Sequence, residues 1–252
     1  NGDHPKFLGV TSQLPWIREQ TRLTFERVGI IDPLDPVDFQ AHGGLAGLRQ
    51  ALAVTSESII DEVMTSGLRG RGGAGFPAAI KWRTVAHAQS DVKYICINAD
   101  EGDSGTFADR VLMEGDPFTL IEGMAISAIA TGATHGYIYI RSEYPDAIAV
   151  MNAALDIARE HDWIGPSILG SHHAFEIQVR VGAGSYVCGE ETAMLESLEG
   201  KRGMVRPKPP IPALSGLFGK PTVINNVMTI AAVPYILAHG GDSYAAIGTE
   251  KS

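Results

Sequence analysis

The sequence contains few cysteines and no long apolar run. Cys96 and Cys188 stand far apart and form no Cys-x-x-Cys pair, so this stretch builds neither a disulfide framework nor a cysteine-ligated cluster. We therefore expect a reducing compartment, the cytoplasm. No segment approaches the roughly 18 consecutive apolar residues of a membrane-spanning helix, and the start lacks the pattern of a signal peptide. Membrane insertion is not expected.

Charge is also scarce, and it is mainly negative. Charged residues make up 19% of the chain and the net charge is −9, which argues against a nucleic-acid partner. The histidines show no metal-ligand spacing, so no metal site is expected. In contrast, 44% of the 252 residues are hydrophobic, enough for a large buried core. The 29 glycines and 14 prolines indicate tight turns and a binding site built from loops.

Helix and strand patterns alternate along most of the chain. Helical periodicity covers 47–64, 78–88, 118–130, 145–160, 191–198 and 225–237, and strand patterns cover 94–98, 135–141 and 175–181. Asp116 before Pro117 is typical of a helix N-cap. The alternation predicts an α/β, Rossmann-like fold with a mostly parallel central sheet flanked by helices. We expect a lead-in over 1–45, one domain over 46–248, and at 249–252 the start of a missing downstream segment.

The first glycine-rich loop runs from Gly67 to Pro77. Residues 70–75 match Gly-x-Gly-x-x-Gly, but they follow a helix rather than a strand, so the usual dinucleotide fingerprint is not met. The glycines still let backbone N–H groups approach a phosphate or a planar ring, next to a helix that begins near Pro77. Lys81 adds a charge one turn inside that helix. A flexible linker is the alternative, although it needs no such basic residues.

Two further loops and a basic strip follow. Residues 99–107 place acids after a strand, where they could accept hydrogen bonds from ribityl or ribose hydroxyls, ligate a cation, or form a solvated turn. In the loop 182–192, Glu190 and Glu191 either contribute to a site or complement the helix dipole. The strip could bind dinucleotide phosphates or be a solvated face; it contains Lys201, Arg202, Arg206 and Lys208. We expect the segments after residues 67, 98 and 182 to converge on one pocket.

Four segments carry a resemblance to a known family, and they occur in order over roughly residues 45–248. They are Gly67-Leu-Arg-Gly-Arg-Gly-Gly-Ala-Gly-Phe-Pro77, Asn98-Ala-Asp-Glu101, Cys188-Gly-Glu-Glu-Thr192 and Lys220-Pro-Thr-Val-Ile-Asn-Asn226. With them the chain resembles the NADH-binding FMN flavoprotein family, which includes the complex I flavin subunit and the diaphorase subunit of NAD-reducing hydrogenases. The resemblance implies that the domain 46–248 binds FMN and NAD(H).

The resemblance also implies site residues. Hydride would pass between the two cofactors, so no catalytic side chain is expected. For Phe76, core packing is the alternative to a role as an aromatic surface for the dinucleotide. The implied FMN residues are Gly70, Gly72, Lys81, Asn98, Asp100, Glu101, Gly189, Glu190, Asn225 and Asn226. The implied NAD residues are Phe76, Asp103, Tyr186, Glu191 and Lys208.

Three positions depart from the family pattern. Thr84 and Ile211 stand where complex I-type members usually carry Phe, which puts a two-sided aromatic grip on the adenine in doubt. Asp103 replaces the more usual Glu. The run 103–109 looks closest to the beta subunit of soluble NAD-dependent formate dehydrogenase, which predicts a module that reduces NAD+ with electrons from formate. The alternatives are a complex I-type or hydrogenase-type NADH-oxidising subunit, a flavin-free dehydrogenase, or a redox-inactive nucleotide-binding interaction module.

The resemblance further implies partners. Full-length relatives carry a downstream four-cysteine segment with a [4Fe-4S] cluster, which we expect only in the missing segment. Relatives also pair with a thioredoxin-like [2Fe-2S] subunit and, in the formate dehydrogenase branch, with a molybdenum-containing catalytic subunit. A multi-subunit electron-transfer complex is therefore the expectation.

Overall fold

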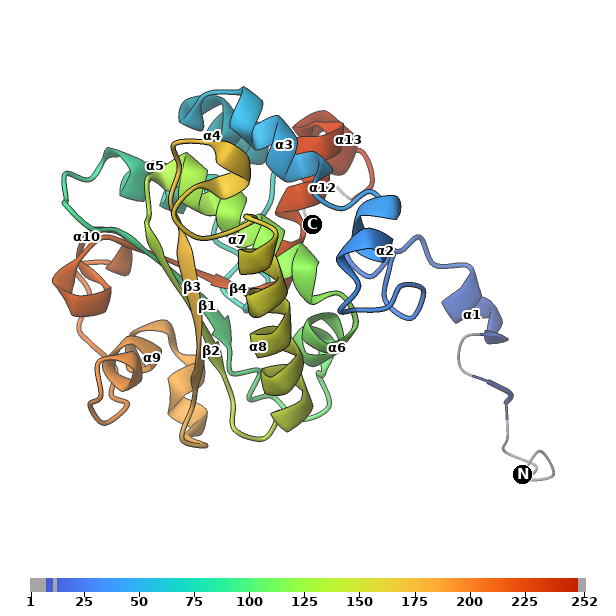
Figure 1. The fold of residues 1–252 in the computed structure, drawn as a ribbon. Coiled ribbons are helices and arrows are strands. Elements are labelled where there is room, and N and C mark those ends of the chain that lie inside the picture. Colours follow the sequence, from blue (N-terminus) through green and yellow to red (C-terminus); the bar gives the residue numbers. More distant parts are fainter. Residues whose placement is uncertain (1–7, 11–12, 249–252) are drawn as a thin grey trace.

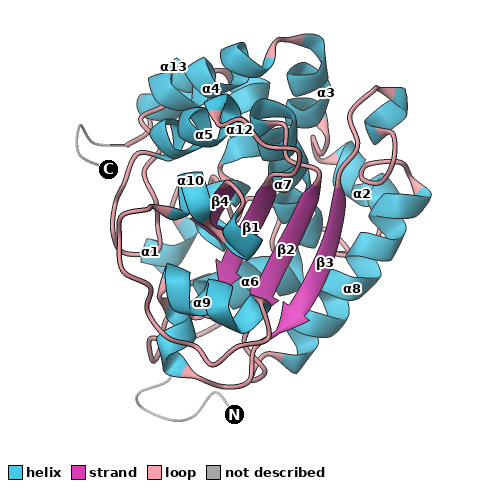
Figure 2. Cartoon of the chain, turned by 90° about the vertical axis from the view of Figure 1, so that its left-hand side faces the viewer, coloured by secondary structure: helices cyan, strands magenta, loops and turns pink. Residues whose placement is uncertain are grey.

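A four-stranded, fully parallel sheet is the centre of the fold (Figures 1 and 2). The computed structural model describes residues 8–10 and 13–248. The strands are β1 (Tyr94–Ala99), β2 (His135–Ile140), β3 (Glu176–Val181) and β4 (Thr222–Asn226), in the order β3-β2-β1-β4. This confirms the predicted fold class. Because all strands are parallel, their carboxyl ends meet at one edge of the sheet, where ligand sites of α/β folds lie.

Helices bury both faces of the sheet. On one face, the main core joins Ile95 and Ile97 of β1 to α7 (Pro117–Thr131), which is buried at every position, and to α8 (Pro145–Glu160). On the other face, Cys96 of β1 packs with Met194 of α9 (Glu191–Leu198) in a second, smaller core. In Figure 2, α9 lies in front of the sheet and α8 behind it. Alternating strand side chains therefore serve two different cores.

The remaining helices complete the layers, and several are short. They are α1 (Pro15–Arg18), α2 (Pro36–Ala41), α3 (Ala46–Ala53), α4 (Ser56–Thr65), α5 (Ala78–His87), α6 (Ala108–Gly115), α10 (Pro212–Ser215), α11 (Val227–Ala231), α12 (Val233–His239), α13 (Gly241–Ala245), and the 3-10 turns η2 (Ile168–Gly170), η3 (Tyr186–Gly189) and η4 (Leu217–Gly219). No helix among the described residues is both long and apolar enough to cross a membrane.

Three element predictions were wrong in detail. The single helix predicted over 47–64 is two helices, because Val54 is extended and the Thr55 side chain caps α4 by accepting a hydrogen bond from Ser58 N. The helix predicted from Asn225 begins only at Val227, since residues 222–226 pair with β1 as a strand. Helix α6 was not predicted at all. Its first turn starts from Phe107, whose φ of 54° is left-handed.

Asp116 is the N-cap residue of α7, with Pro117 at the first helical position, as predicted. Its side chain, however, caps no backbone N–H. Instead, its Oδ2 accepts hydrogen bonds from Arg27 Nε at 2.9 Å and from the Thr119 hydroxyl at 2.6 Å. The carboxylate is therefore shared between the Thr119 hydroxyl in the first turn of α7 and a distant arginine, and it binds no backbone N–H of the helix.

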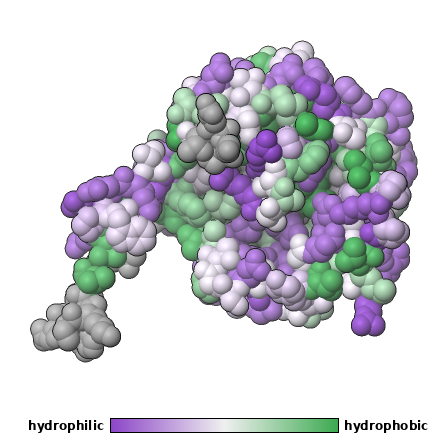
Figure 3. Space-filling view, turned by 180° about the vertical axis from the view of Figure 1, so that it is seen from behind, coloured by the Kyte–Doolittle hydropathy of each residue, from purple (hydrophilic) through white to green (hydrophobic). Residues whose placement is uncertain are grey.

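The segment before residue 45 is partly integrated into the domain. The buried ring of Phe39 on α2 lies 5.3 Å from the ring of Phe118 and 5.7 Å from that of Trp163, centroid to centroid. Helix α1 lies away from the body in Figure 1 and in the space-filling view of Figure 3, where polar and apolar residues are interspersed over the visible face. The domain boundary at 45 stays a prediction, and the segment predicted at 249–252 lies outside the described residues.

Candidate functional site

Two loops meet beyond the carboxyl ends of β1 and β3. Asn98 Nδ2 donates a hydrogen bond to the carbonyl oxygen of Gly189 at 2.8 Å. The Tyr186 hydroxyl donates to Asp103 Oδ1 at 2.8 Å. The end of β1 and the loop that follows it are therefore each bound to the loop after β3, although 91 and 83 residues separate the paired residues in sequence.

The glycine-rich loop closes the same site from the side of β4. Arg71 N donates to the Thr229 hydroxyl oxygen at 2.9 Å, and a Cβ added to Gly72 would lie 3.3 Å from Asn226 Cβ. Asn226 Nδ2 in turn donates to Asp109 Oδ2, 2.6 Å away, just beyond the loop after β1. The three segments thus lie next to one another, with the end of β4 as the link between them. That they enclose one pocket stays a prediction.

Glycine residues allow these loops to pass close to their neighbours. A Cβ at Gly102 would lie 2.9 Å from the Tyr186 ring, which any side chain would have to push away. Gly73 has a φ of 106°, in the left-handed region that favours glycine. Backbone atoms of the glycine-rich loops therefore form much of the surface of the site, so that a phosphate or a planar ring can approach them closely.

Lys81 is a positively charged side chain at this site. Its Nζ donates to the carbonyl oxygen of Ile224 at 2.6 Å, and within the described part of the chain no carboxylate forms an ion pair with it. Burial lowers the pKa of Lys81, the negative charge of Glu191 opposes that shift, and Lys208 adds to it. A half-buried ammonium group without a direct counter-ion suits an anionic ligand group such as a phosphate. These residues therefore fit the phosphate end of FMN.

The acids after β1 have different roles. Asp100 is buried, and burial raises its pKa while Arg141 opposes the shift. The Glu101 carboxylate accepts hydrogen bonds from the backbone N–H groups of Asp109 and Arg110, at 2.9 and 3.2 Å, and from the Tyr144 hydroxyl at 3.0 Å. Glu101 thus completes the first turn of α6. Its carboxylate is already bonded to three protein donors.

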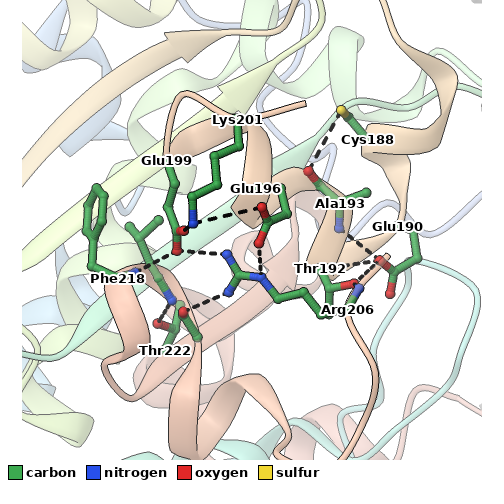
Figure 4. Close-up of polar contacts among 12 residues, drawn as sticks. Cys188, Glu190, Thr192, Ala193, Glu196, Glu199, Lys201, Arg206, Phe218 and Thr222 are labelled. Atoms are coloured by element: carbon green, nitrogen blue, oxygen red, sulfur yellow. Dashed lines mark hydrogen bonds and ion pairs between the residues drawn. The ribbon is translucent and has the colours of Figure 1, made fainter. Parts of the chain in front are cut away.

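Glu190 caps α9 (Figure 4). Its Oε2 accepts hydrogen bonds from the backbone N–H groups of Thr192 at 2.7 Å and Ala193 at 2.9 Å, which realises the helix-dipole alternative. Burial raises the pKa of Glu190, but these bonds and Lys208 outweigh it, so the pKa lies below its usual value. Lys208 Nζ lies 3.2 Å from Glu190 Oε1 and 2.6 Å from Glu191 Oε1. The Pro-rich segment is thereby attached to the start of α9.

The two neighbouring asparagines of β4 point to opposite faces of the sheet. Asn225 is buried, and in the amide orientation that satisfies its neighbours it accepts a hydrogen bond from Trp82 Nε1 at 3.0 Å. Asn226 lies beside Gly72 and also caps α11 by accepting a hydrogen bond from Met228 N. Of this pair, only Asn226 stands among the loops of the site.

The side chains predicted to bind NAD(H) lie at the outer rim. Phe76 is 49% exposed and Tyr186 is 72% exposed, so core packing does not account for Phe76. Thr84 donates its hydroxyl hydrogen bond to the Ile80 carbonyl oxygen within α5, and Ile211 is exposed at the start of α10. Helices α5 and α10 contact each other. The two positions that depart from the family pattern therefore lie on adjacent elements.

Asp109 was missed at the sequence level. It is buried, and burial followed by the charge of Glu101 raises its pKa to about 7, against the hydrogen bond from Asn226. Its only sequence signal is an acid on the apolar face of a short amphipathic helix, a helix that was not predicted.

Neither of two cavities in the described structure is lined by residues of 67–77 or 98–107. One, of about 310 Å³, is next to η3 and is lined by Tyr139, Cys188 and Ser197, among others. The other, of about 170 Å³, is lined by Arg27, Asp116 and Glu122, among others. The geometry of the loops, rather than the size of a cavity, locates the candidate site. Among the described residues, no group of three or more His, Cys, Asp or Glu could hold a metal ion.

Comparisons with known proteins agree with this geometry. The family model described as the Nuo51 FMN-binding domain (Complex1_51K) matches residues 63–235. The chain is 53% identical over 215 residues to an NADH-quinone oxidoreductase subunit of Rhizobium meliloti (strain 1021), covering 85% of this chain and 51% of that protein. It is 48% identical over 235 residues to the NADP-reducing hydrogenase subunit HndC of Solidesulfovibrio fructosivorans, covering 93% of this chain and 48% of that protein.

A solved structure extends the likeness to the fold. The crystal structure of NAD+-reducing [NiFe]-hydrogenase in the air-oxidized state matches with a TM-score of 0.75 and 35% identity, over 92% of this chain and 37% of that chain. The chain spans about half the length of the curated relatives it matches. Matched over most of its length by the family model, and with its glycine loops assembled at one edge of a parallel sheet, the chain belongs to the Nuo51 FMN-binding domain family.

Proposed function

We propose that this chain is the FMN- and NAD(H)-binding module of a multi-subunit oxidoreductase. FMN, when bound, supplies a ring that takes a hydride from, or returns it to, a nicotinamide and passes electrons on singly. The observation that carries the proposal is the position of Lys81, an ammonium group with no ion pair among the described residues. It lies on the helix that follows the glycine-rich loop, and its Nζ is 2.6 Å from the Ile224 carbonyl oxygen of β4. The chain's own task is to bind and to orient the two cofactors.

We assign the FMN contacts to the inner part of the site. Lys81 binds the phosphate, while the backbone of Gly70, Gly72 and Gly189 lets the ring system approach closely. Short polar side chains next to these glycines serve the ribityl chain and the ring edge; they are Asn98, Asp100 and Asn226. Glu101 and Glu190 act through the backbone turns that they hold. Asn225 acts from the buried face, where its amide lies against Trp82.

We assign the NAD(H) contacts to the rim. Phe76 and Tyr186 offer exposed aromatic surfaces. Asp103 holds the Tyr186 hydroxyl, and Lys208 lies between Glu190 and Glu191. Since Thr84 and Ile211 are not aromatic, a base bound between α5 and α10 would have less stacking surface than two Phe side chains provide.

We further propose that the module reduces NAD+ with electrons from formate oxidation, in the cytoplasm. The support is the run Asp103-Ser-Gly-Thr-Phe-Ala-Asp109, together with two buried free thiols that suit a reducing compartment. The partners would be a thioredoxin-like [2Fe-2S] subunit and a molybdenum-containing catalytic subunit. The names of the relatives favour the alternative of a complex I-type or hydrogenase-type assembly.

An anaerobic titration tests the proposed function. The chain is loaded with FMN, freed of excess flavin and titrated with NADH while the flavin absorbance is followed. The proposal expects stoichiometric FMN binding and bleaching by about one equivalent of NADH, since NADH donates two electrons and oxidised FMN accepts two. A chain that binds NADH but no flavin would point to a flavin-free dehydrogenase. Flavin that is bound but never bleached would point to a redox-inactive binding module.

A further inference from the structure

Arg206, at the start of the Pro-rich segment, contacts three separate parts of the chain (Figure 4). Its Nη2 lies 2.8 Å from Glu199 Oε1, and its Nε pairs with Glu196 on α9. Its Nη1 donates to the carbonyl oxygen of Gly216 at 3.0 Å. Through its backbone N it also donates to the Thr192 hydroxyl oxygen at 2.8 Å. One residue thus binds the Pro-rich segment to α9 and to the turn before β4.

This network is well shielded from solvent. The Glu199 side chain is 7% exposed and the Arg206 side chain 23%. Burial disfavours the charge of Arg206, but the two carboxylates outweigh it, so its pKa lies above the usual value. Partly buried ion pairs are screened less than exposed ones, and a planar guanidinium can bind two carboxylates in fixed directions. The contacts therefore fix the backbone at Arg206, a restraint that an exposed pair would not provide.

The network leads directly to the rim of the candidate site. The Thr192 hydroxyl that accepts the bond from Arg206 N donates its own hydrogen to Glu190 Oε2 at 2.5 Å. Lys208, two residues after Arg206, lies against Glu190 and Glu191. The intervening residue is Pro207, and prolines follow Lys208 at 209 and 210, so φ is fixed at three of the four residues 207–210. Displacement at Arg206 is thus transmitted to Lys208.

We propose that Arg206 is a positioning residue for the dinucleotide, which places Lys208, Glu190 and Glu191 at the rim of the site without touching either cofactor. The inference rests on the proposed function and deepens it. Arg206 turns inward to Glu196 and Glu199, so of the basic strip at 201–208 it is a structural member, while Lys208 faces the site. NAD(H) affinity then depends on a partly buried ion-pair network at the C-terminal end of α9.

The test compares Arg206→Gln with a matched control, Arg159→Gln. Arg159 also binds two carboxylates, those of Asp156 and Glu176, and one backbone carbonyl, that of Ile177. It lies at the opposite edge of the sheet, near the start of β3. Both variants are loaded with FMN. KM and kcat are measured with NADH and ferricyanide as the electron acceptor, and hydrogen exchange of residues 200–215 is recorded in the absence of nucleotide.

We expect Arg206→Gln to raise KM for NADH about tenfold, the loss of about 1.4 kcal/mol of binding. FMN content and kcat should stay near wild type, because an interaction lost equally in ground and transition states changes KM alone. Exchange over 200–215 should become faster. Arg206→Lys keeps the positive charge but not the planar guanidinium group, so its KM for NADH and its exchange over 200–215 should lie between those of wild type and Arg206→Gln. Arg159→Gln should leave KM and this exchange unchanged.

The inference would be overturned by exchange over 200–215 that is no faster than in Arg159→Gln, or by faster exchange with an unchanged KM. Equal losses of FMN, kcat and stability in both variants would also overturn it, because they would reduce Arg206 to a general structural role. A wild-type chain that NADH does not bleach instead contradicts the proposed function. The exchange measurement needs no nucleotide, so it still decides whether Arg206 holds the segment.

Discussion

At the scale of single residues, Lys81 and Lys93 form a natural pair for comparison. Both are lysines whose Nζ donates to backbone carbonyls, Lys81 to Ile224 and Lys93 to Ala86 and Thr131. Burial lowers the pKa of each. Only Lys81 stands among the loops of the candidate site, whereas Lys93 precedes β1 at the other edge of the sheet.

We predict that Lys81→Met weakens FMN binding about tenfold or more, since a charge-assisted hydrogen bond is worth about 1.5–3 kcal/mol. Lys93→Met removes an ammonium group that is likewise hydrogen-bonded to backbone carbonyls but lies far from the loops. This variant should leave FMN affinity unchanged. Fluorescence titration of the free flavin measures both dissociation constants. Equal affinities of the two variants would remove Lys81 from the site.

Asp109 predicts a pH dependence of stability. Its folded pKa of about 7 lies above the usual 3.8, so the folded state holds the proton more tightly than the unfolded state. This contribution is present below about pH 4 and is lost as the pH rises towards about 7, by at most about 4 kcal/mol. Asp109→Asn should therefore flatten the fall in the free energy of unfolding across this range, as measured by urea denaturation.

Asp91→Asn is the control for this prediction. Asp91 is exposed and pairs with Lys220, and the hydrogen bond from Lys220 lowers its pKa. Its contribution lies at lower pH, so the variant should keep the wild-type slope between about pH 4 and 7. An Asp109→Asn protein with that same slope would contradict the assigned pKa.

At the residue level, the sequence indicates positions with distinctive local chemistry, and it does not indicate contacts that depend on tertiary partners. Lys81 and the glycines were recognised because few other roles suit a basic residue beside a glycine-rich turn. The sequence did not show that the Asn225 and Asn226 side chains point to opposite faces of the sheet, because this part of β4 had been predicted as the start of a helix. The Glu101 and Glu190 carboxylates each bind backbone N–H groups at a helix start. For Glu190 this was one of the two alternatives, and for both residues contact with the cofactor stays a prediction.

At the scale of elements, close helix packing depends on glycine. A Cβ added to Gly123 of α7 would clash with the Ile230 carbonyl oxygen on α11. Such a clash requires the two helices to move apart. Because α11 starts directly from Asn226 at the end of β4, this packing also helps to position Asn226 at the site.

We predict that Gly123→Ala destabilises the chain by about 1–3 kcal/mol or more, because overpacking in a dense core strains the backbone. Helix propensity alone predicts the opposite, a gain of about 1 kcal/mol. The sign of the change in the free energy of unfolding therefore decides between the two. A stabilised Gly123→Ala protein would show that α7 and α11 are not in contact as described.

Most elements were predictable because apolar periodicity is strong in them. Strands β1 and β2 are mostly buried apolar runs, whereas β3 alternates between buried and exposed positions. Helix α7 is bounded by Pro117 and Gly132, and α8 begins at Pro145. The misses share a physical reason. β4 and α11 run together without a breaker, and α6 starts at a left-handed Phe107 with its first N–H groups bound by Glu101, a residue outside the helix. Neither feature leaves a local signal.

At the scale of the whole molecule, the parallel sheet explains why one edge carries the function. Four carboxyl ends and the glycine loop before α5 meet there, and the contacts that join them are between segments about 80–160 residues apart. The family match confirms the FMN-binding assignment made from the sequence. The chain spans about half the length of the curated relatives it matches, so the electron donor or acceptor beyond the flavin is part of the proposed function and not of the family assignment.

The central claim is that segments distant in sequence form one flavin site, and hydrogen exchange with and without FMN tests it most directly. The account predicts that FMN slows exchange together in residues 69–77, 98–107, 182–190 and 224–229, while α8 over 145–160 is unaffected. Protection limited to one of these segments, or protection centred on α8, would contradict it.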